Sequence, residues 1–300
     1  MQEYNGILPL YKPRGMTSHD CVFRLRKLLK FRKIGHTGTL DPDVDGVLVL
    51  CLGRATRVAR FLLDYGKTYE GILTLGTATT TEDRSGEVIE SCDVETAVAR
   101  SRVEAVFASL HGTIEQKAPL YSAVKVNGRK LYEYARAGLP VERPVRQVKI
   151  YHLELLDEAQ EYQREIPFRV SCSKGTYVRT LAVDIGRRLG YPAHLHRLTR
   201  LKAGPFRLSD CLTFEQIETQ VSENRFQSCL KPLEVALGHL GSWTVDDQEA
   251  VKISHGAVLP IPAQFDDQPH AVYNNKGVCL AIYQIHPENP GLIKPLKVLL

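Results

Sequence analysis

The chain has 300 residues, of which 43% are hydrophobic and 24% charged, and its formal net charge is +5. A chain of this length can bury a sizeable core and is long enough for two domains. No apolar run approaches the roughly 20 residues of a membrane span, and no secretory signal is recognisable. Seven scattered cysteines without a C-x-x-C pair argue against disulfides and zinc, so we expect a cytoplasmic protein.

The first half of the chain alternates predicted helices and strands. Residues 18–31 carry an apolar stripe between arginines and lysines, which predicts a helix. The apolar run 46–52 is typical of a buried strand, and 55–64 predicts a short helix. Further on, the patterns predict a strand at 67–76, a polar loop at 77–86, a helix at 95–110, strands at 147–156 and 166–173, and a helix at 177–190. Interleaved strands and helices indicate a mixed α/β or α+β body.

Three stretches are rich in Lys and Arg and poor in acids: residues 21–40, 117–149 and 186–208. Basic patches on a nearly neutral protein favour a polyanionic partner such as nucleic acid. The segment 118–144 is basic, rich in tyrosine and broken by Gly and Pro, which predicts an excursion from the sheet over the surface. Beyond about residue 240, the short β patterns 251–261, 270–285 and 292–300 predict a small separate β domain.

The stretch DPDVDG places carboxylates at alternate positions directly before the predicted buried strand. Asp41, Asp43 and Asp45, followed by Gly46, imitate the first half of a calcium-binding EF-hand loop. The twelfth position of that loop requires a bidentate glutamate, and here it is Leu52. Aspartyl-phosphate phosphatases also fit poorly, because their acids follow a strand and these precede one. We therefore expect no metal ion here.

Asp41 lies between Leu40 and Pro42, and proline restricts the residue before it to extended conformations. Gly35 and Gly38 just upstream permit a close approach of something bulky. No Walker or dinucleotide-binding motif occurs, so a nucleotide cofactor is not expected. From these residues alone, Asp41 can be either a turn cap or a catalytic carboxylate.

Several motifs in this order distinguish the two possibilities: KPRGMTS (12–18), GHTGTLDPDVDGVLVLCLGRATR (35–57), KTYEG (67–71), the run from Gln116 through APLYSAVKVNGRKLYEYARAG, and SKGTYVRTLAVDIGRRLG (173–190). Over residues 5–215 the chain resembles the TruB-type tRNA pseudouridine synthases. The resemblance implies an α+β pseudouridine synthase fold, with a mixed, largely antiparallel central sheet flanked by helices. It divides the chain into a catalytic domain (1–238, with an RNA-binding insertion at about 117–146) and a PUA-like RNA-binding domain (239–300).

The resemblance also assigns the catalytic residues. Asp41 matches the family's essential aspartate, and Tyr69 matches the tyrosine that stacks on the flipped base and relays the C5 proton. Arg179 matches the arginine that pairs with the aspartate. Because an opposite charge nearby favours an ionised carboxyl group, we expect Arg179 to lower the pKa of Asp41.

Five further positions match residues that bind the substrate. Tyr177 and Leu198 match residues that line the uridine pocket and contact the base. His36 matches the histidine that takes part in extruding the base. Lys12 and Pro13 match the KP element beside the catalytic loop.

The function implied is isomerisation of a uridine to pseudouridine in the T-loop of tRNA (position 55) by an isomerase that needs no cofactor and no metal. Its partner would be the T-arm stem-loop, with no membrane and no obligate protein partner, and the enzyme would be a monomer. Breaking a glycosidic bond and rotating the base suits one carboxylate and an aromatic platform. Two alternatives stay open: a synthase that acts on another RNA, and a non-catalytic RNA-binding protein or RNA chaperone of the same fold.

Overall fold

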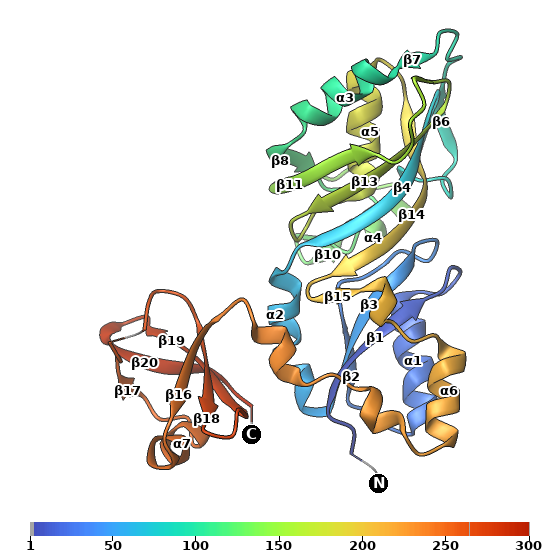
Figure 1. The fold of residues 1–300 in the computed structure, drawn as a ribbon. Helices are drawn as coiled ribbons and strands as arrows, with labels where there is room; N and C mark the ends of the chain where they lie inside the picture. The colour runs from blue at the N-terminus through green and yellow to red at the C-terminus, as the bar shows by residue number, and fades with distance from the viewer. Residues whose placement is uncertain (1–2, 264, 300) are drawn as a thin grey trace.

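The structure is a computed structural model that describes residues 3–263 and 265–299. An elongated body holds one long sheet, and a smaller unit that contains the C-terminus lies beside its lower half (Figure 1). Helices α3 (Arg100–Ser109) and α5 (Val178–Leu189) cover the upper part of the sheet. Helices α1 (Ser18–Leu29) and α6 (Phe214–Ser222) cover the lower part.

The long sheet has nine strands in the order β1-β3-β14-β4-β13-β11-β8, with β2 paired to β3 and β15 to β14. Their bounds are β1 Gly6–Lys12, β2 Ile34–Thr37, β3 Asp45–Leu52, β4 Lys67–Leu75, β8 Gly112–Lys117, β11 Val145–Leu155, β13 Glu165–Cys172, β14 Ala193–Ala203 and β15 Phe206–Arg207. Every pair in this sheet is antiparallel except β3 with β14. The predicted α+β class with a mixed, largely antiparallel sheet is therefore confirmed.

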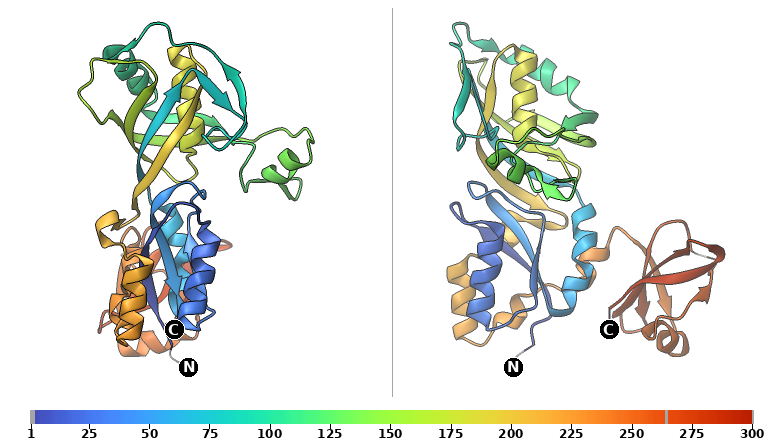
Figure 2. Two further views of the ribbon diagram at one scale, coloured as in Figure 1. Left: turned by 90° about the vertical axis from the view of Figure 1, so that its right-hand side faces the viewer. Right: turned by 180° about the vertical axis from the view of Figure 1, so that it is seen from behind.

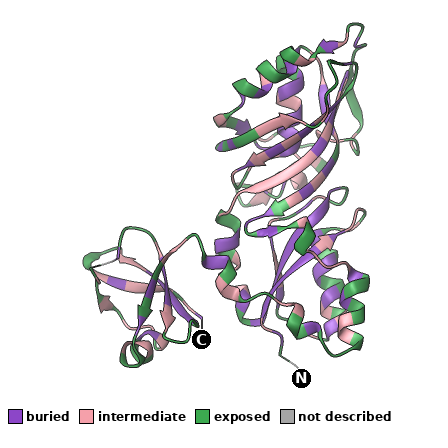
Figure 3. Ribbon diagram, viewed as in Figure 1, coloured by how far each residue is buried: buried purple, intermediate pink, exposed green. Residues whose placement is uncertain are grey.

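Strand β3 is buried along its whole length, because its two faces enter two different cores (Figure 3). Leu48, Leu50 and Leu52 join the main core beneath α1, whereas the residues between them face a second core on the other side. A strand that is covered on both faces has no place for alternating polar residues. This explains the unbroken apolar run and confirms the strand that it predicted.

The parallel junction of β3 with β14 depends on a glycine. Thr199 lies opposite Asp45, and Arg200 opposite Gly46. Gly46 has φ +108°, and a Cβ there would lie 2.2 Å from the carbonyl oxygen of Arg200. Only glycine permits this approach of the two backbones.

The local sequence explains where α1 begins and ends. The Thr17 hydroxyl and the Asp20 carboxylate form a reciprocal capping box at its start. Lys30 ends the helix in the left-handed conformation, with φ 49°. The predicted helix 18–31 is confirmed to within two residues.

The segment 118–144 leaves the body as the predicted excursion (left view of Figure 2). It contains a small hairpin of β9 (Lys125–Val126) and β10 (Arg129–Lys130), followed by α4 (Leu131–Arg136). Ala118, Val124 and Leu131 form a small apolar cluster of its own.

Five strands between residues 241 and 298 form a second sheet in the order β16-β18-β19-β20-β17. Its elements are β16 Gly241–Val245, α7 Asp247–Ser254, β17 Leu259–Pro260, β18 His270–Asn274, β19 Cys279–His286 and β20 Asn289–Val298. Ala271 and Ile282 of this unit share a core with Phe61 and Leu62 of α2 (Ala59–Asp64). The division of the chain at residue 238 stays a prediction.

Four sequence predictions need correction. Residues 251–254 belong to α7 and not to a β segment, because Asp246 caps a helix there by accepting from the N–H of Glu249. The polar loop 77–86 begins with β5 (Thr77–Thr79), which pairs with β6 (Val88–Ser91). The helix predicted at 95–110 begins only at Arg100, after the short strand β7 (Val98–Ala99). The helix predicted at 55–64 begins as a 3-10 turn, Gly53–Val58.

Candidate active site

A cavity of about 940 Å³ opens where the two halves of the long sheet meet. Five of the candidate residues line it together: Asp41, Tyr69, Tyr177, Arg179 and Leu198. They come from the loop before β3, from β4, from the start of α5 and from β14. Residues far apart in the sequence thus meet at one site.

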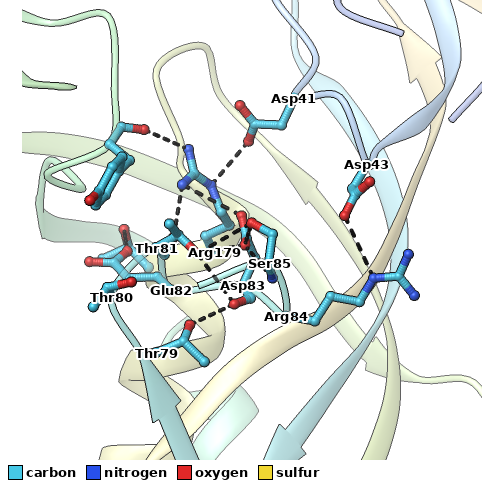
Figure 4. Close-up of polar contacts among 12 residues, drawn as sticks. Asp41, Asp43, Thr79, Thr80, Thr81, Glu82, Asp83, Arg84, Ser85 and Arg179 are labelled. Carbon is cyan, nitrogen blue, oxygen red and sulfur yellow. Dashed lines mark hydrogen bonds and ion pairs between the residues drawn. The ribbon is translucent and has the colours of Figure 1, made fainter. Parts of the chain in front are cut away.

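Asp41 and Arg179 form an ion pair at the cavity wall (Figure 4). The Oδ2 of Asp41 lies 3.0 Å from the Nε of Arg179, whose side chain is only 9% exposed. The remaining nitrogens of Arg179 donate to the carbonyl oxygens of Thr81 (2.8 Å) and Tyr121 (3.1 Å). The guanidinium is therefore fixed on three sides, and it orients the carboxylate.

The loop that holds Arg179 is the polar segment 79–86, for which the sequence suggested no role. Asp83 lies 3.7 Å from the Nη1 of Arg179. The other oxygen of Asp83 accepts from the Thr81 hydroxyl (2.7 Å) and the Ser85 amide (3.0 Å). Figure 4 shows how this cluster faces Arg179. The run of Thr, Asp and Ser was the available signal, since such residues form local side-chain-to-backbone bonds.

The surrounding protein dominates the protonation of Asp41, although 44% of its side chain stays exposed at the cavity. Its desolvation raises the carboxyl pKa, and Asp83 raises it further, while the Arg179 guanidinium and Lys12 oppose the rise. The net direction is upward from the ordinary value. Arg179 acts in the expected direction, but desolvation outweighs this one ion pair, so the net shift of the Asp41 pKa is upward.

The KPRGMTS motif holds the loop that carries Asp41. Lys12 is fully buried, and its ammonium donates to the carbonyl oxygens of Pro13 (2.9 Å) and Pro42 (3.1 Å). The Ser18 hydroxyl bonds both the amide and the carbonyl of Leu40. Two residues that flank Asp41 are thus bonded to the motif, which sets the direction of its side chain.

The other two acids of DPDVDG are bonded to different parts of the molecule. Asp45 accepts from Tyr11 (3.1 Å), Arg14 (3.2 Å) and Thr199 (2.6 Å). Asp43 lies 3.7 Å from Arg84, and both of these side chains are largely exposed. Asp45 therefore joins β1, the turn after it and β14, whereas Asp43 makes only a surface pair.

Known proteins are similar to this chain in sequence and in fold. A family model described as the TruB family pseudouridylate synthase N-terminal domain matches residues 26–178. A second model, the tRNA pseudouridylate synthase B C-terminal domain, matches residues 179–238. The chain belongs to the TruB family of pseudouridylate synthases.

Two relatives of the TruB family are similar over nearly the whole chain. The tRNA pseudouridine synthase B of Geobacillus thermodenitrificans (strain NG80-2) is 54% identical, with 98% of this chain and 99% of the relative covered. The protein of the same name from Bacillus cereus (strain ATCC 10987 / NRS 248) is 52% identical, with 98% and 97% covered.

Solved structures show the same pseudouridine synthase fold. One chain of a crystal structure of a Cbf5-Nop10-Gar1 complex is similar with a TM-score of 0.77 and 28% identity, covering 99% of this chain and 85% of that one. A chain of an H/ACA RNP bound to a substrate RNA with 2'-deoxyuridine has a TM-score of 0.74 and 27% identity, covering 98% and 85%.

Tyr177 and Leu198 are held by neighbouring strands and side chains. The side-chain amide of Gln116 accepts from the Tyr177 N–H (3.0 Å) and donates to its carbonyl (3.2 Å). Leu198 lies opposite Gly71 in the β14–β4 pair, where a Cβ would come within 3.0 Å of its Cδ1. Gly71 thus leaves room for the leucine at the cavity.

The structure does not bring His36, Lys12 and Pro13 into the cavity lining. His36 lies on β2, and its Nδ1 is buried without a hydrogen-bond partner among the residues described. Burial lowers its pKa, with His19 and Arg200 acting in the same direction, which favours the neutral imidazole. Lys12 is bonded to the loop of Asp41 through the Pro42 carbonyl, and the Pro13 carbonyl accepts from the same ammonium.

The excursion contributes the outer wall of the cavity. Tyr121, Ser122, Lys125 and Tyr132 line it from this side. The cations of Lys130 and Arg136 lie 5.4 Å and 5.3 Å from the centre of the Tyr132 ring. Within residues 3–263 and 265–299, no group of His, Cys, Asp or Glu is arranged to hold a metal ion, and no helix is long and apolar enough to cross a membrane.

Proposed function

We propose that this TruB-family enzyme isomerises a uridine of tRNA to pseudouridine, at position 55 of the T-loop. The observation that carries the proposal is the single cavity in which Asp41, paired with Arg179, lies together with Tyr69 and Leu198. The relatives that are named tRNA pseudouridine synthase B and match nearly end to end support the choice of substrate.

The reaction breaks the bond between N1 of the base and C1′ of the ribose, turns the base and joins C5 to C1′. In our proposal the Asp41 carboxylate is the one reactive group, as nucleophile or as base. Arg179 holds one of its oxygens, and Asp41 lines the cavity. Tyr69 stacks on the extruded base and relays the C5 proton, and Tyr177 and Leu198 enclose the ring.

His36, Lys12 and Pro13 have supporting roles in this proposal. We assign His36, whose strand leads into the catalytic loop, to extrusion of the base, and a neutral imidazole suits insertion into a base stack. Lys12 and Pro13 keep the loop of Asp41 in place. No step in this scheme calls for a metal or an organic cofactor.

The partner in this proposal is the T-arm stem-loop of tRNA. A folded RNA is bound through its phosphates by Lys and Arg, and unstacked bases stack on aromatic side chains. The excursion supplies both, with Lys125, Arg129 and Arg136 beside Tyr132 and Tyr134. We further propose that the enzyme acts as a monomer in the cytoplasm, and that residues 239–300 bind RNA as a PUA-like domain.

Release of tritium from a tRNA transcript labelled at uridine C5 tests the activity, because only isomerisation at C5 frees that hydrogen. We expect release from a transcript with an intact T-arm and none when its target uridine is replaced. Asp41→Asn should abolish release and leave tRNA affinity within a few-fold.

Other results of the tritium-release assay would support one of the alternative functions or remove Asp41 from the chemistry. Release from ribosomal RNA but not from tRNA would indicate another target. Binding of tRNA with no release by the wild-type protein would indicate a non-catalytic RNA-binding protein. Appreciable turnover by Asp41→Asn would remove Asp41 from the chemistry.

A further inference from the structure

Arg200, on β14, is a buried cation that the scheme above leaves without a role. Its side chain is 1% exposed and lines the same cavity as Asp41 and Tyr69. Among the residues described, no carboxylate lies within ion-pair distance of it. An arginine buried without a counter-ion is unfavourable unless other contacts or a function compensate.

Backbone carbonyl groups hold the guanidinium in place. Its Nε donates to the carbonyl oxygen of Val47 (2.7 Å), and its Nη2 donates to that of Gly38 (3.0 Å). These bonds join β14 to β3 and to the glycine turn that precedes Asp41. They fix the position of the charge but do not neutralise it.

Tyr69 is the residue directly opposite Arg200 in the antiparallel pair of β4 and β14. Side chains at directly opposite positions lie on the same face of the sheet, with Cβ atoms about 4.5–5.5 Å apart. Burial raises the pKa of the Tyr69 phenol, and the charge of Arg200 is the strongest influence that opposes the rise. The same charge contributes to lowering the pKa of Lys67, which lines this cavity too.

We propose that Arg200 is a positioning residue for the isomerisation, which holds the Tyr69 phenol at the cavity and stabilises its oxygen as phenolate during proton transfer. This inference rests on the proposed function, in which Tyr69 relays the C5 proton. A preorganised cation in a site shielded from water stabilises a developing negative charge more strongly than water does.

The proton transfers balance without a further reactant. The phenol gives its proton to N1 of the detached base, which leaves a phenolate beside Arg200. After C5 has bonded to C1′, the C5–H bond breaks and its electron pair restores the C5–C6 double bond. The proton passes to the phenolate oxygen, so one proton has moved from C5 to N1 overall.

A double-mutant cycle on the full-length protein tests the link between the two residues. Single-turnover tritium release is measured for wild type, Arg200→Gln, Tyr69→Phe and the double variant, together with melting temperature and tRNA affinity. We expect Arg200→Gln to lower the rate by about 10–100-fold at an affinity within a few-fold, the scale of one positioned polar group. In the Tyr69→Phe protein, Arg200→Gln should lower the single-turnover rate by less than about two-fold.

Two companion variants separate charge from packing. Arg200→Lys keeps the buried cation and should recover part of the rate in the Tyr69 protein only, and the cycle can be run with it if Arg200→Gln does not fold. Arg164→Gln is the matched control, because the Arg164 side chain is 57% exposed and lies outside the cavity lining and outside the three basic stretches. Its rate should equal that of wild type.

Equal losses from Arg200→Gln and Arg200→Lys in both backgrounds would overturn the inference, since Arg200 would then act on the fold and not through the phenol oxygen. A pH profile of the rate gives a second reading: the phenol must be protonated at the start, so its pKa sets the falling limb, and we expect Arg200→Gln to move that limb to higher pH. An unmoved limb would count against the inference. Absence of tritium release by wild type would instead defeat the proposed function itself.

Discussion

The loop 38–46, which carries Asp41, and the excursion 118–144 line the same cavity, but they are held in opposite ways. The loop is bonded to elements remote in sequence: Asp41 to Arg179, Pro42 to Lys12 and Asp45 to Thr199. The excursion is bonded mostly to itself. Tyr134 donates to the Val126 carbonyl, and Arg129 donates to the Glu133 carbonyl.

This difference matches two different demands. Covalent chemistry requires reacting groups to be held within a fraction of an ångström, which needs anchors from several directions. Binding of a polyanion requires charge and aromatic surface that can adjust to the ligand. We therefore expect substitutions in the loop and its anchors to change the rate, and substitutions in the excursion to change affinity.

Of the substitutions considered, Arg179→Lys should cause the largest loss of rate. Lysine keeps the charge but cannot donate at once to Asp41, the Thr81 carbonyl and the Tyr121 carbonyl. We expect the single-turnover rate to fall by at least about 100-fold, with tRNA affinity within a few-fold of wild type. A variant that binds weakly and reacts at the normal rate would show that Arg179 is another phosphate contact.

Most of the site could be predicted from the sequence, because its motifs are contiguous and resemble one family. What could not be predicted depends on contacts between distant segments. Nothing in the sequence of the 79–86 loop shows that Thr81 and Asp83 face Arg179. Strand β14 was missed because Arg197 and Lys202 interrupt its apolar pattern, and its pairing with β3 rests on the close approach at Gly46.

Substitution of the two acids that follow Asp41 should change the stability of the folded protein by unequal amounts, because only Asp45 is bonded to remote elements. Asp45→Asn should destabilise the folded protein by about 2 kcal/mol, since a buried carboxylate with three donors loses its charge beside Arg14. Asp43→Asn is the matched control, and its exposed pair with Arg84 should contribute less than about 0.5 kcal/mol. Urea denaturation followed by circular dichroism measures both.

The stability difference between wild type and Asp45→Asn should depend on pH in a definite direction. Hydrogen bonds from Thr199 and Arg14 outweigh the burial of Asp45, so its folded pKa lies below the ordinary value. Its stabilisation is then complete above the unfolded pKa of about 4 and disappears as the pH falls through the folded pKa. The gap between wild type and Asp45→Asn should narrow from pH 7 toward about pH 3. A gap that is constant over this range would mean that the charge of Asp45 contributes nothing.

Substitutions in the excursion should weaken tRNA binding moderately and leave the rate of reaction unchanged. Arg129→Ala and Arg136→Ala each remove a cation that lies over a tyrosine ring, that of Tyr134 or Tyr132. We expect each to weaken tRNA binding by about 3–10-fold and to flatten its salt dependence, while the rate at saturation stays normal. Arg225→Ala is the control for net charge, because the Arg225 side chain is 63% exposed and lies outside the three basic stretches. A drop in the saturated rate with unchanged affinity would show that the excursion takes part in the chemistry.

The smallest expected effect is that of calcium, for which DPDVDG imitates half of a binding loop. The three carboxylates are not available together: Asp41 faces Arg179, Asp43 faces Arg84 and Asp45 faces Arg14. A calcium ion needs six to eight oxygens around one centre, and here it would have to draw each acid away from a guanidinium. We expect millimolar calcium to shift the melting temperature by less than about 1 °C, and excess EDTA to leave the single-turnover rate unchanged. A rise of several degrees would mean that calcium can pull these acids away from their arginines. The loop would then be held too weakly to explain the losses of rate expected from substitutions in its anchors.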